Sequence, residues 1–286
     1  MALHALSLCS GIGGLDLALR SLGVVSVGYV ERDAYAAAVL VDRMADKALD
    51  PGPVWSDLAT FDALPWRGVV DVLASGVPCQ PFSCAGSKRG VEDERHLWPL
   101  VARLTRVIEP RLVVVENVAG LVRLGLRSVL EDLAGLGFDA EWGVLSAADV
   151  GAPHGRDRLF LVAWRGQEAL EALAYPDGEG RGPERESSGR RGGEGSLRDQ
   201  PDGRSQEDAS LGPWPPASDD REGWAWVLAA RPDLAPAQPV LRDVADGTPG
   251  EVDGDSWGDQ LRCLGNAVVP VQAATAIRAL ARRGLA

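Results

Sequence analysis

Residues 3–20 read LHALSLCSGIGGLDLALR, and this stretch decides the fold. Residues 3–8 are mostly apolar and predict a short buried strand, whereas residues 15–20 have the spacing of a helix. Glycines at 11, 13 and 14 lie between them, where they permit a tight turn and let a ligand approach the backbone closely. The stretch therefore predicts a strand, a glycine turn and a helix whose first N–H groups face a ligand.

The same alternation continues along the chain. Further strands are expected at 24–30, 71–74, 112–115, 142–145 and 159–163, and helices at 34–44, 96–108, 125–136 and 272–283. Strands that alternate with helices of this length predict an α/β fold with a doubly wound, mostly parallel, Rossmann-like sheet.

The composition divides the chain into three parts. Residues 176–210 consist mainly of Gly, Arg, Glu, Ser, Asp and Pro, a composition that cannot form a core and predicts a disordered surface insertion. We therefore expect a catalytic and cofactor-binding domain at 1–165 and a small variable region at 166–260. A C-terminal motif and helix at 261–286 then return to the first domain.

Charge and apolar content restrict the class of protein. The net charge of -12 argues against a protein that coats nucleic acid nonspecifically, although a cleft that binds DNA needs only a local basic surface. We find no run of about 18 apolar residues and no signal peptide, so we expect a cytoplasmic protein without membrane contact. The four cysteines have no CxxC spacing and are expected to be reduced thiols.

Two carboxylates follow strands on the side of the glycine turn. Glu31 ends the second strand, where it could accept hydrogen bonds from ribose hydroxyls, and Asp57 could accept one from an adenine amine. The glycine spacing is not that of a dinucleotide fingerprint, because position 16 is Asp. Each acid alone would be an ordinary solvated charge, but together with the turn they suit a nucleoside cofactor.

Cys79 lies in a stiff turn that follows the strand ending near residue 74. Gly76, Pro78 and Pro81 surround it, and a turn of this kind presents a thiol into a cleft. The next strand leads to Glu116 and Asn117 at the same edge of a parallel sheet. Arg156 and Arg158 are two residues apart and would point the same way in an extended segment, with a salt-bridge role as the alternative.

The ordered motifs resemble those of the cytosine-C5 DNA methyltransferase family of bacterial and phage type. The resemblance covers residues 3–165 and 261–284, and its motifs are SGIGG at 10–14, PCQPFS at 78–83, ENV at 116–118, RDR at 156–158 and GNAVVP at 265–270.

The resemblance implies a covalent mechanism. Cys79 would add to C6 of a cytosine flipped out of the duplex, so that C5 can attack a methyl group. Glu116 would hydrogen-bond the N3 edge, Arg158 would hold O2, and Arg156 would support the cysteine loop and a phosphate. Asn117 completes the predicted catalytic set.

The implied cofactor is S-adenosylmethionine, and no metal is expected. The residues assigned to it are Ser10, Gly11, Gly13 and Leu15 around the methionine part, Glu31 on the ribose, Asp57 on the adenine amine, Pro78 between cofactor and base, and Asn266 and Val268 near the methyl end.

The chain departs from the family pattern at several positions. Cys9 stands where many members carry an aromatic side chain against the adenine, and His154 stands where a Gln is frequent. The variable region, which reads DNA sequence in the family, is short, so the target sequence cannot be deduced. The implied partner is double-stranded DNA, with a cognate restriction endonuclease left open. A monomer in the cytoplasm of a bacterium or phage-infected host is expected.

Three other functions share some of these sequence features. A tRNA cytosine methyltransferase would share the fold and nucleophile, but its distinctive Cys-Phe-Thr stretch is not found in the sequence. A catalytically silent DNA-binding relative would not need Cys79, Glu116 and Arg158 together. A nicotinamide-dependent oxidoreductase would need a different glycine spacing.

Overall fold

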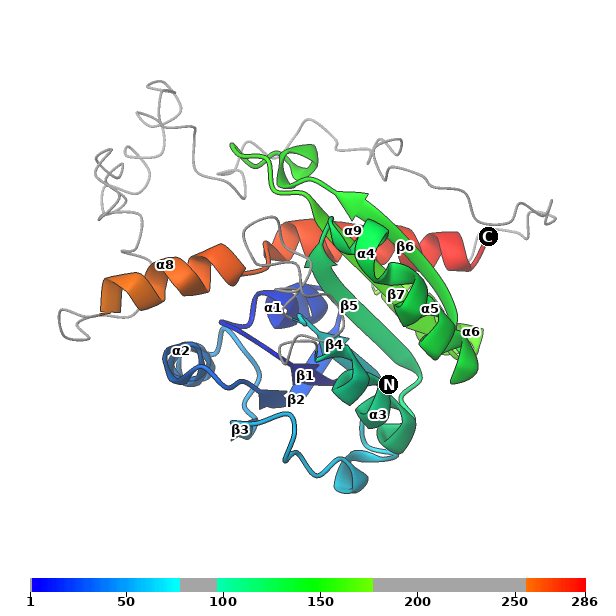
Figure 1. The fold of residues 1–286 in the computed structure, drawn as a ribbon, viewed down its shortest axis with the longest axis horizontal. Helices are drawn as coiled ribbons and strands as arrows, with labels where there is room; N and C mark the ends of the chain where they lie inside the picture. The colour runs from blue at the N-terminus through cyan, green and yellow to red at the C-terminus, as the bar shows by residue number, and fades with distance from the viewer. Residues whose placement is uncertain (1, 78–96, 177–255) are drawn as a thin grey trace.

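The computed structural model describes residues 2–77, 97–176 and 256–286 (Figure 1). Its centre is a seven-stranded sheet with the order β3-β2-β1-β4-β5-β7-β6. The strands are β1 (Leu3–Leu8), β2 (Val24–Val30), β3 (Val54–Trp55), β4 (Val72–Ser75), β5 (Leu112–Val118), β6 (Asp139–Leu145) and β7 (Arg158–Trp164). All neighbouring pairs are parallel except those of β7, which runs antiparallel between β5 and β6. The predicted mostly parallel sheet is confirmed.

Helices cover both faces of the sheet, which explains why its central strands are almost continuously apolar. On one face pack α1 (Gly14–Ser21), α6 (Gln167–Ala174) and α9 (Pro270–Gly284), which share one hydrophobic core with the sheet. On the other face pack α3 (Trp98–Ile108) and α5 (Leu126–Gly135) (Figure 1). The short α4 (Leu121–Leu124) precedes α5, and α2 (Ala34–Ala45) packs beside β2.

Two 3-10 turns and one further helix complete the described elements. The turns are η1 (Leu64–Trp66) and η4 (Ala147–Val150), and the helix is α8 (Ser256–Asn266). A stretch at Arg262–Gly284 is long and apolar enough on average to cross a membrane. The structure breaks this stretch at 267–269, between α8 and α9, and packs α9 on the sheet with Ile277 and Leu280 fully buried.

Most predicted elements form, with differences at their ends. The predicted bounds of β1 and β2 are those observed, but β5 continues to Val118, so Glu116 and Asn117 belong to the strand itself. The described part of α3 begins at Trp98, and residue 96 lies outside the described residues. Helix α6 was not predicted, and its buried Leu170 and Leu173 extend the core of the sheet beyond residue 165.

Candidate active site at the carboxyl edge of the sheet

The site lies where β1, β2, β4 and β5 end, because parallel strands bring their carboxyl ends to one edge. Gly76 shows how closely these ends meet. A Cβ on Gly76 would lie 3.2 Å from the carbonyl oxygen of Cys9 and 3.9 Å from Oε2 of Glu116. The chain that leaves β4 toward Cys79 therefore starts between the glycine turn and Glu116.

The glycine turn is held by one hydrogen bond to the end of β2 and one within its own backbone. The N–H of Ser10 donates to the carbonyl of Val30 at 3.2 Å, and the N–H of Gly13 donates to the carbonyl of Ser10 at 2.9 Å. Gly11 and Gly13 have positive φ angles of 55° and 82°, a region that glycine enters without strain. The space where a Cβ of Gly11 would lie is open, so a ligand can approach the backbone there.

Glu31 lies beside this turn and is fixed by two backbone donors. Its Oε2 accepts from the N–H of Gly11 at 2.7 Å, and its Oε1 accepts from the N–H of Asp33 at 2.7 Å. Each carboxylate oxygen can accept a further hydrogen bond. The carboxylate is thus preoriented beside the turn, as a ribose acceptor would need to be.

The first turn of α1 meets the segment that returns from the C-terminal part of the chain. A Cβ on Gly14 would lie only 2.3 Å from the carbonyl oxygen of Val268, so only glycine fits at this contact. Val268 and the preceding Asn266 are thereby placed near the glycine turn. The side chain of Leu15 is buried in the core, which leaves its backbone N–H as the group that could face a cofactor.

Asp57 follows β3 and is partly buried. Its Oδ1 accepts from the N–H of Ala59 at 2.9 Å, which fixes the carboxylate in a turn. The second oxygen is left for an exocyclic amine. The carboxylates of Glu31 and Asp57 supply acceptors, and the open backbone at Gly11 leaves room beside Glu31, an arrangement that fits a nucleoside.

Glu116 and Arg158 form the charged centre of the edge. Nε of Arg158 lies 3.0 Å from Oε1 of Glu116, and Glu116 is only 7% exposed. Burial raises the pKa of Glu116 to about 7, and the nearby guanidinium groups of Arg158 and Arg156 oppose this rise. The carboxyl can therefore hold or release a proton near neutral pH.

Arg156 has different partners from Arg158. Its Nη2 donates to the carbonyl oxygens of Gly265 at 2.7 Å and Ala267 at 2.6 Å. Burial lowers the pKa of Arg156, and the charge of Arg158 adds to this effect. Among the described residues, Arg156 thus holds the GNAVVP motif at the edge, while the predicted contact with the cysteine loop concerns residues that are not described.

Asn117 holds the start of that loop. Its Nδ2 donates to the carbonyl of Val77 at 3.1 Å, and its Oδ1 accepts from the N–H of Val118 at 2.8 Å. Val77 directly precedes Pro78 and Cys79, which both lie outside the described residues. The structure therefore locates the beginning of the loop, and the nucleophile itself stays a prediction.

The two described cysteines are free thiols. Burial, assisted by the charge of Glu31, raises the pKa of Cys9 to about 12, and burial raises the pKa of Cys263 to about 11. Both stay protonated at neutral pH, so neither suits a role that requires a thiolate. Within the described ranges, we find no cluster of three His, Cys, Asp or Glu side chains that could hold a metal.

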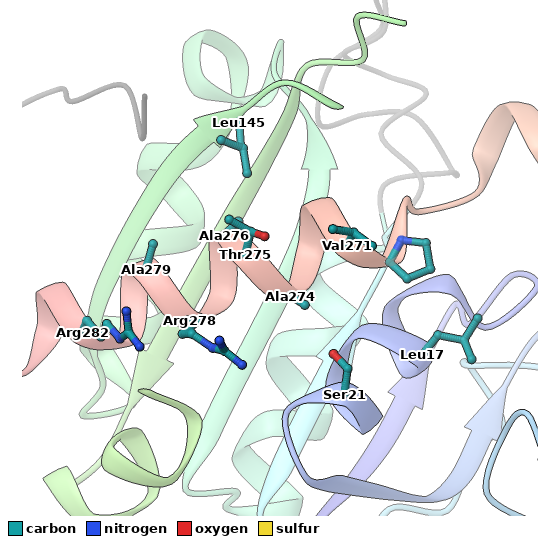
Figure 2. A pocket seen from close by; sticks show the side chains of 11 residues that line it. Leu17, Ser21, Leu145, Val271, Ala274, Thr275, Ala276, Arg278, Ala279 and Arg282 are labelled. Atoms are coloured by element: carbon teal, nitrogen blue, oxygen red, sulfur yellow. The ribbon is translucent and has the colours of Figure 1, made fainter. Parts of the chain in front are cut away.

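A cavity of about 270 Å³ lies between α1 and α9 (Figure 2). Leu17 and Ser21 of α1 face the outward side of α9 across it, and Arg278 and Arg282 border it. Among the predicted cofactor and catalytic residues that the structure describes, none lines this cavity. The candidate site therefore lies at the strand ends, and the cavity between α1 and α9 is not part of it.

Sequence reasoning missed Asp33 and Arg262. Nη2 of Arg262 in α8 lies 2.5 Å from Oδ2 of Asp33 at the start of α2, although 229 residues separate them in sequence. No local pattern could have revealed a pair so far apart. Gly14 was read only as part of the turn, and its contact with Val268 became evident only in the structure.

The sheet order, with helices on both faces and a glycine turn after β1, is that of a Rossmann-like α/β fold. A DNMT2 structure from Spodoptera frugiperda supports this fold, with a TM-score of 0.58 and 16% identity over 98% of this chain and 99% of that one.

Residues 3–208 match the family model for C-5 cytosine-specific DNA methylase, and the chain belongs to this family. It is 36% identical to the Type II methyltransferase M.NaeI of Lentzea aerocolonigenes, over 64% of this chain and 44% of the relative. It is 34% identical to M.NgoMIV of Neisseria gonorrhoeae, over 58% of this chain and 53% of the relative. The chain thus covers about half of these relatives' length.

Proposed function

We propose that this protein transfers the methyl group of S-adenosylmethionine to C5 of a cytosine in duplex DNA, through a covalent bond between Cys79 and C6. The observation that carries this proposal is the buried pair of Glu116 and Arg158 beside Gly76, where the chain leaves β4 toward Cys79. Membership of the C-5 cytosine-specific DNA methylase family supports it.

The cofactor half of the site is formed by residues that fit a nucleoside. Glu31 would accept from the ribose hydroxyls, Asp57 from the adenine amine, and the backbone at Gly11 would lie against the methionine part. Asn266 and Val268 would approach from the returning segment. When bound, S-adenosylmethionine supplies an electrophilic methyl group on a sulfonium.

The protein's own groups prepare the cytosine for attack. The Cys79 thiolate forms a bond to C6, and the negative charge that develops on the ring is stabilised at N3 by a proton or hydrogen bond from Glu116. A pKa of about 7 keeps a large fraction of Glu116 protonated at neutral pH, which suits a proton donor. Arg158, already within 3.0 Å of Glu116, would hold O2 of the same ring.

The proposal also includes a binding partner and a location in the cell. Double-stranded DNA is the proposed substrate, in line with relatives that carry the name Type II methyltransferase. A cognate restriction endonuclease that acts on the same site is also part of the proposal. A monomer in the cytoplasm of a bacterium or phage-infected host completes the proposal.

The test is transfer of labelled methyl from S-adenosylmethionine to duplex DNA, and covalent trapping on DNA that contains 5-fluorocytosine. The variant Cys79→Ala should lose both, whereas Cys84→Ala, five positions away in the sequence, is the matched control and should retain both. Methyl transfer by Cys79→Ala at the parent rate would refute the mechanism. Transfer to tRNA alone would refute the substrate, and binding of DNA without any transfer would identify a silent relative.

Bisulfite sequencing of DNA from cells that express the protein tests the same proposal in a native setting. It reports the activity and the target sequence in one experiment. A genome without methylated cytosine above the background of an empty vector would contradict the proposed function.

A further inference from the structure

The last turns of α8 lie against the start of α2 and the glycine turn (Figure 1). Cys263 is 8% exposed and packs with Ile12, Ala36 and Val39. Ile12 belongs to the glycine turn itself. Helix α8 therefore packs against both the glycine turn and α2.

A charged contact accompanies this packing. Nη2 of Arg262 bonds Oδ2 of Asp33 at 2.5 Å and lies 2.8 Å from Oδ1 of Asp259 on its own helix. Asp33 is also the N-cap of α2, because its Oδ1 accepts from the N–H of Ala36 at 3.0 Å. The Asp33 carboxylate is thus fixed from both sides.

Asp33 in turn fixes Glu31. Its backbone N–H donates to Oε1 of Glu31 at 2.7 Å, while Gly11 holds the other oxygen. A side chain on α8 is therefore linked through one residue to the carboxylate beside the glycine turn. Arg262 also brings a positive charge to a place where two carboxylates lie two residues apart.

We propose that Arg262 is a positioning residue for cofactor binding, which acts on Glu31 through Asp33. The inference rests on the proposed function, in which Glu31 accepts the ribose hydroxyls of S-adenosylmethionine. A preoriented acceptor binds a hydroxyl pair without the cost of ordering its own side chain. Loss of Arg262 removes one of the two groups that fix the Asp33 carboxylate, and the loop between Glu31 and α2 becomes less rigid.

Calorimetric titration of the full chain with S-adenosylhomocysteine, without DNA, measures this role directly. We expect Arg262→Ala to weaken binding about three- to fivefold, the loss expected for a half-exposed ion pair, and Arg262→Lys to recover part of it. In methyl transfer, the KM for S-adenosylmethionine should rise while kcat at saturation stays close to that of the parent. Arg127→Ala is the matched control, because its ion pair with Glu131 at 2.8 Å lies on the exposed surface.

A double-mutant cycle separates positioning from general destabilisation. In a Glu31→Gln background, Arg262→Ala should weaken binding by less than twofold, because its effect passes through Glu31. Equal losses in both backgrounds, or parental affinity of Arg262→Ala, would overturn the positioning role alone. A parent protein that does not bind S-adenosylhomocysteine would instead overturn the proposed function, and the inference with it.

Discussion

Replacing Glu116 by Gln tests the buried carboxyl at the centre of the site. Gln has the shape of the protonated acid but cannot ionise. Because burial raises the pKa of Glu116 from 4.5 to about 7, the folded protein binds this proton more tightly than the unfolded chain does. The free energy of unfolding is therefore unaffected by this carboxyl below pH 4.5, and it falls as the pH rises from 4.5 to about 7.

The size of this effect follows from the same pKa values. At about 1.4 kcal/mol for each pH unit, ionisation of Glu116 costs the folded state roughly 3 kcal/mol at pH 8.5. We therefore expect Glu116→Gln to gain up to about 3 kcal/mol over the parent between pH 4.5 and 8.5. Its methyl transfer should nevertheless fall by about 10² to 10⁴-fold, the usual contribution of a proton-transfer group.

Urea unfolding at closely spaced pH values measures the difference in free energy between parent and variant. Glu131→Gln is the matched control, since Glu131 is an exposed carboxylate on α5 that pairs with Arg127 far from the strand ends. A constant difference between the parent and Glu116→Gln across this range would refute the assignment of a raised pKa. A variant with parental transfer rates would refute the role of the carboxyl in the reaction.

Three further substitutions test the frame of the site. Gly14→Ala places a methyl group 2.3 Å from a backbone carbonyl oxygen, so it should lower the free energy of unfolding by more than about 2 kcal/mol and weaken cofactor binding. The control is Gly135→Ala, whose methyl group meets no atom within 4 Å and which should be neutral or stabilising in thermal unfolding. Burial raises the pKa of Asp16 to about 6, so its ionisation destabilises the folded protein at high pH. Asp16→Asn should therefore be more stable than the parent at pH 8 and equally stable below pH 4. A variant that is no more stable than the parent at pH 8 would contradict this. Asn117→Asp removes the donor that bonds the carbonyl of Val77 at 3.1 Å. It should lower the rate of methyl transfer at least tenfold in single-turnover assays and leave the affinity for S-adenosylhomocysteine unchanged. An unchanged rate would show that this contact does not position the loop.

The sequence predicted the elements that local patterns specify. The strand, turn and helix of residues 3–20 formed as expected because apolar periodicity and glycine positions act over a few residues. The sequence pattern predicts that the strand beginning at Leu112 ends at Val115 and that Glu116 and Asn117 lie at its carboxyl end. Residues 116–118 extend β5 because each pairs with a residue of β7, from Glu116 with Phe160 to Val118 with Arg158.

Long-range contacts could not be predicted in this way. The placement of β7 between β5 and β6, and the contacts of Arg156 with carbonyls more than 100 residues away, depend on tertiary packing. Helix α6 could not be predicted for the same reason. Its sequence QEALEALA has helical spacing, but its identity as a core element depends on α9, which packs on it.

The returning C-terminal segment is an integral part of the cofactor half of the site. Gly14 admits the carbonyl of Val268, Arg156 binds the carbonyls of the GNAVVP motif, and Arg262 binds Asp33. These three contacts come from different elements, and each joins residues more than 100 positions apart. The glycine turn alone would be a common α/β connection. Because two strand ends and one returning segment converge on it beside the buried Glu116, the turn is the place where we propose that the nucleoside binds.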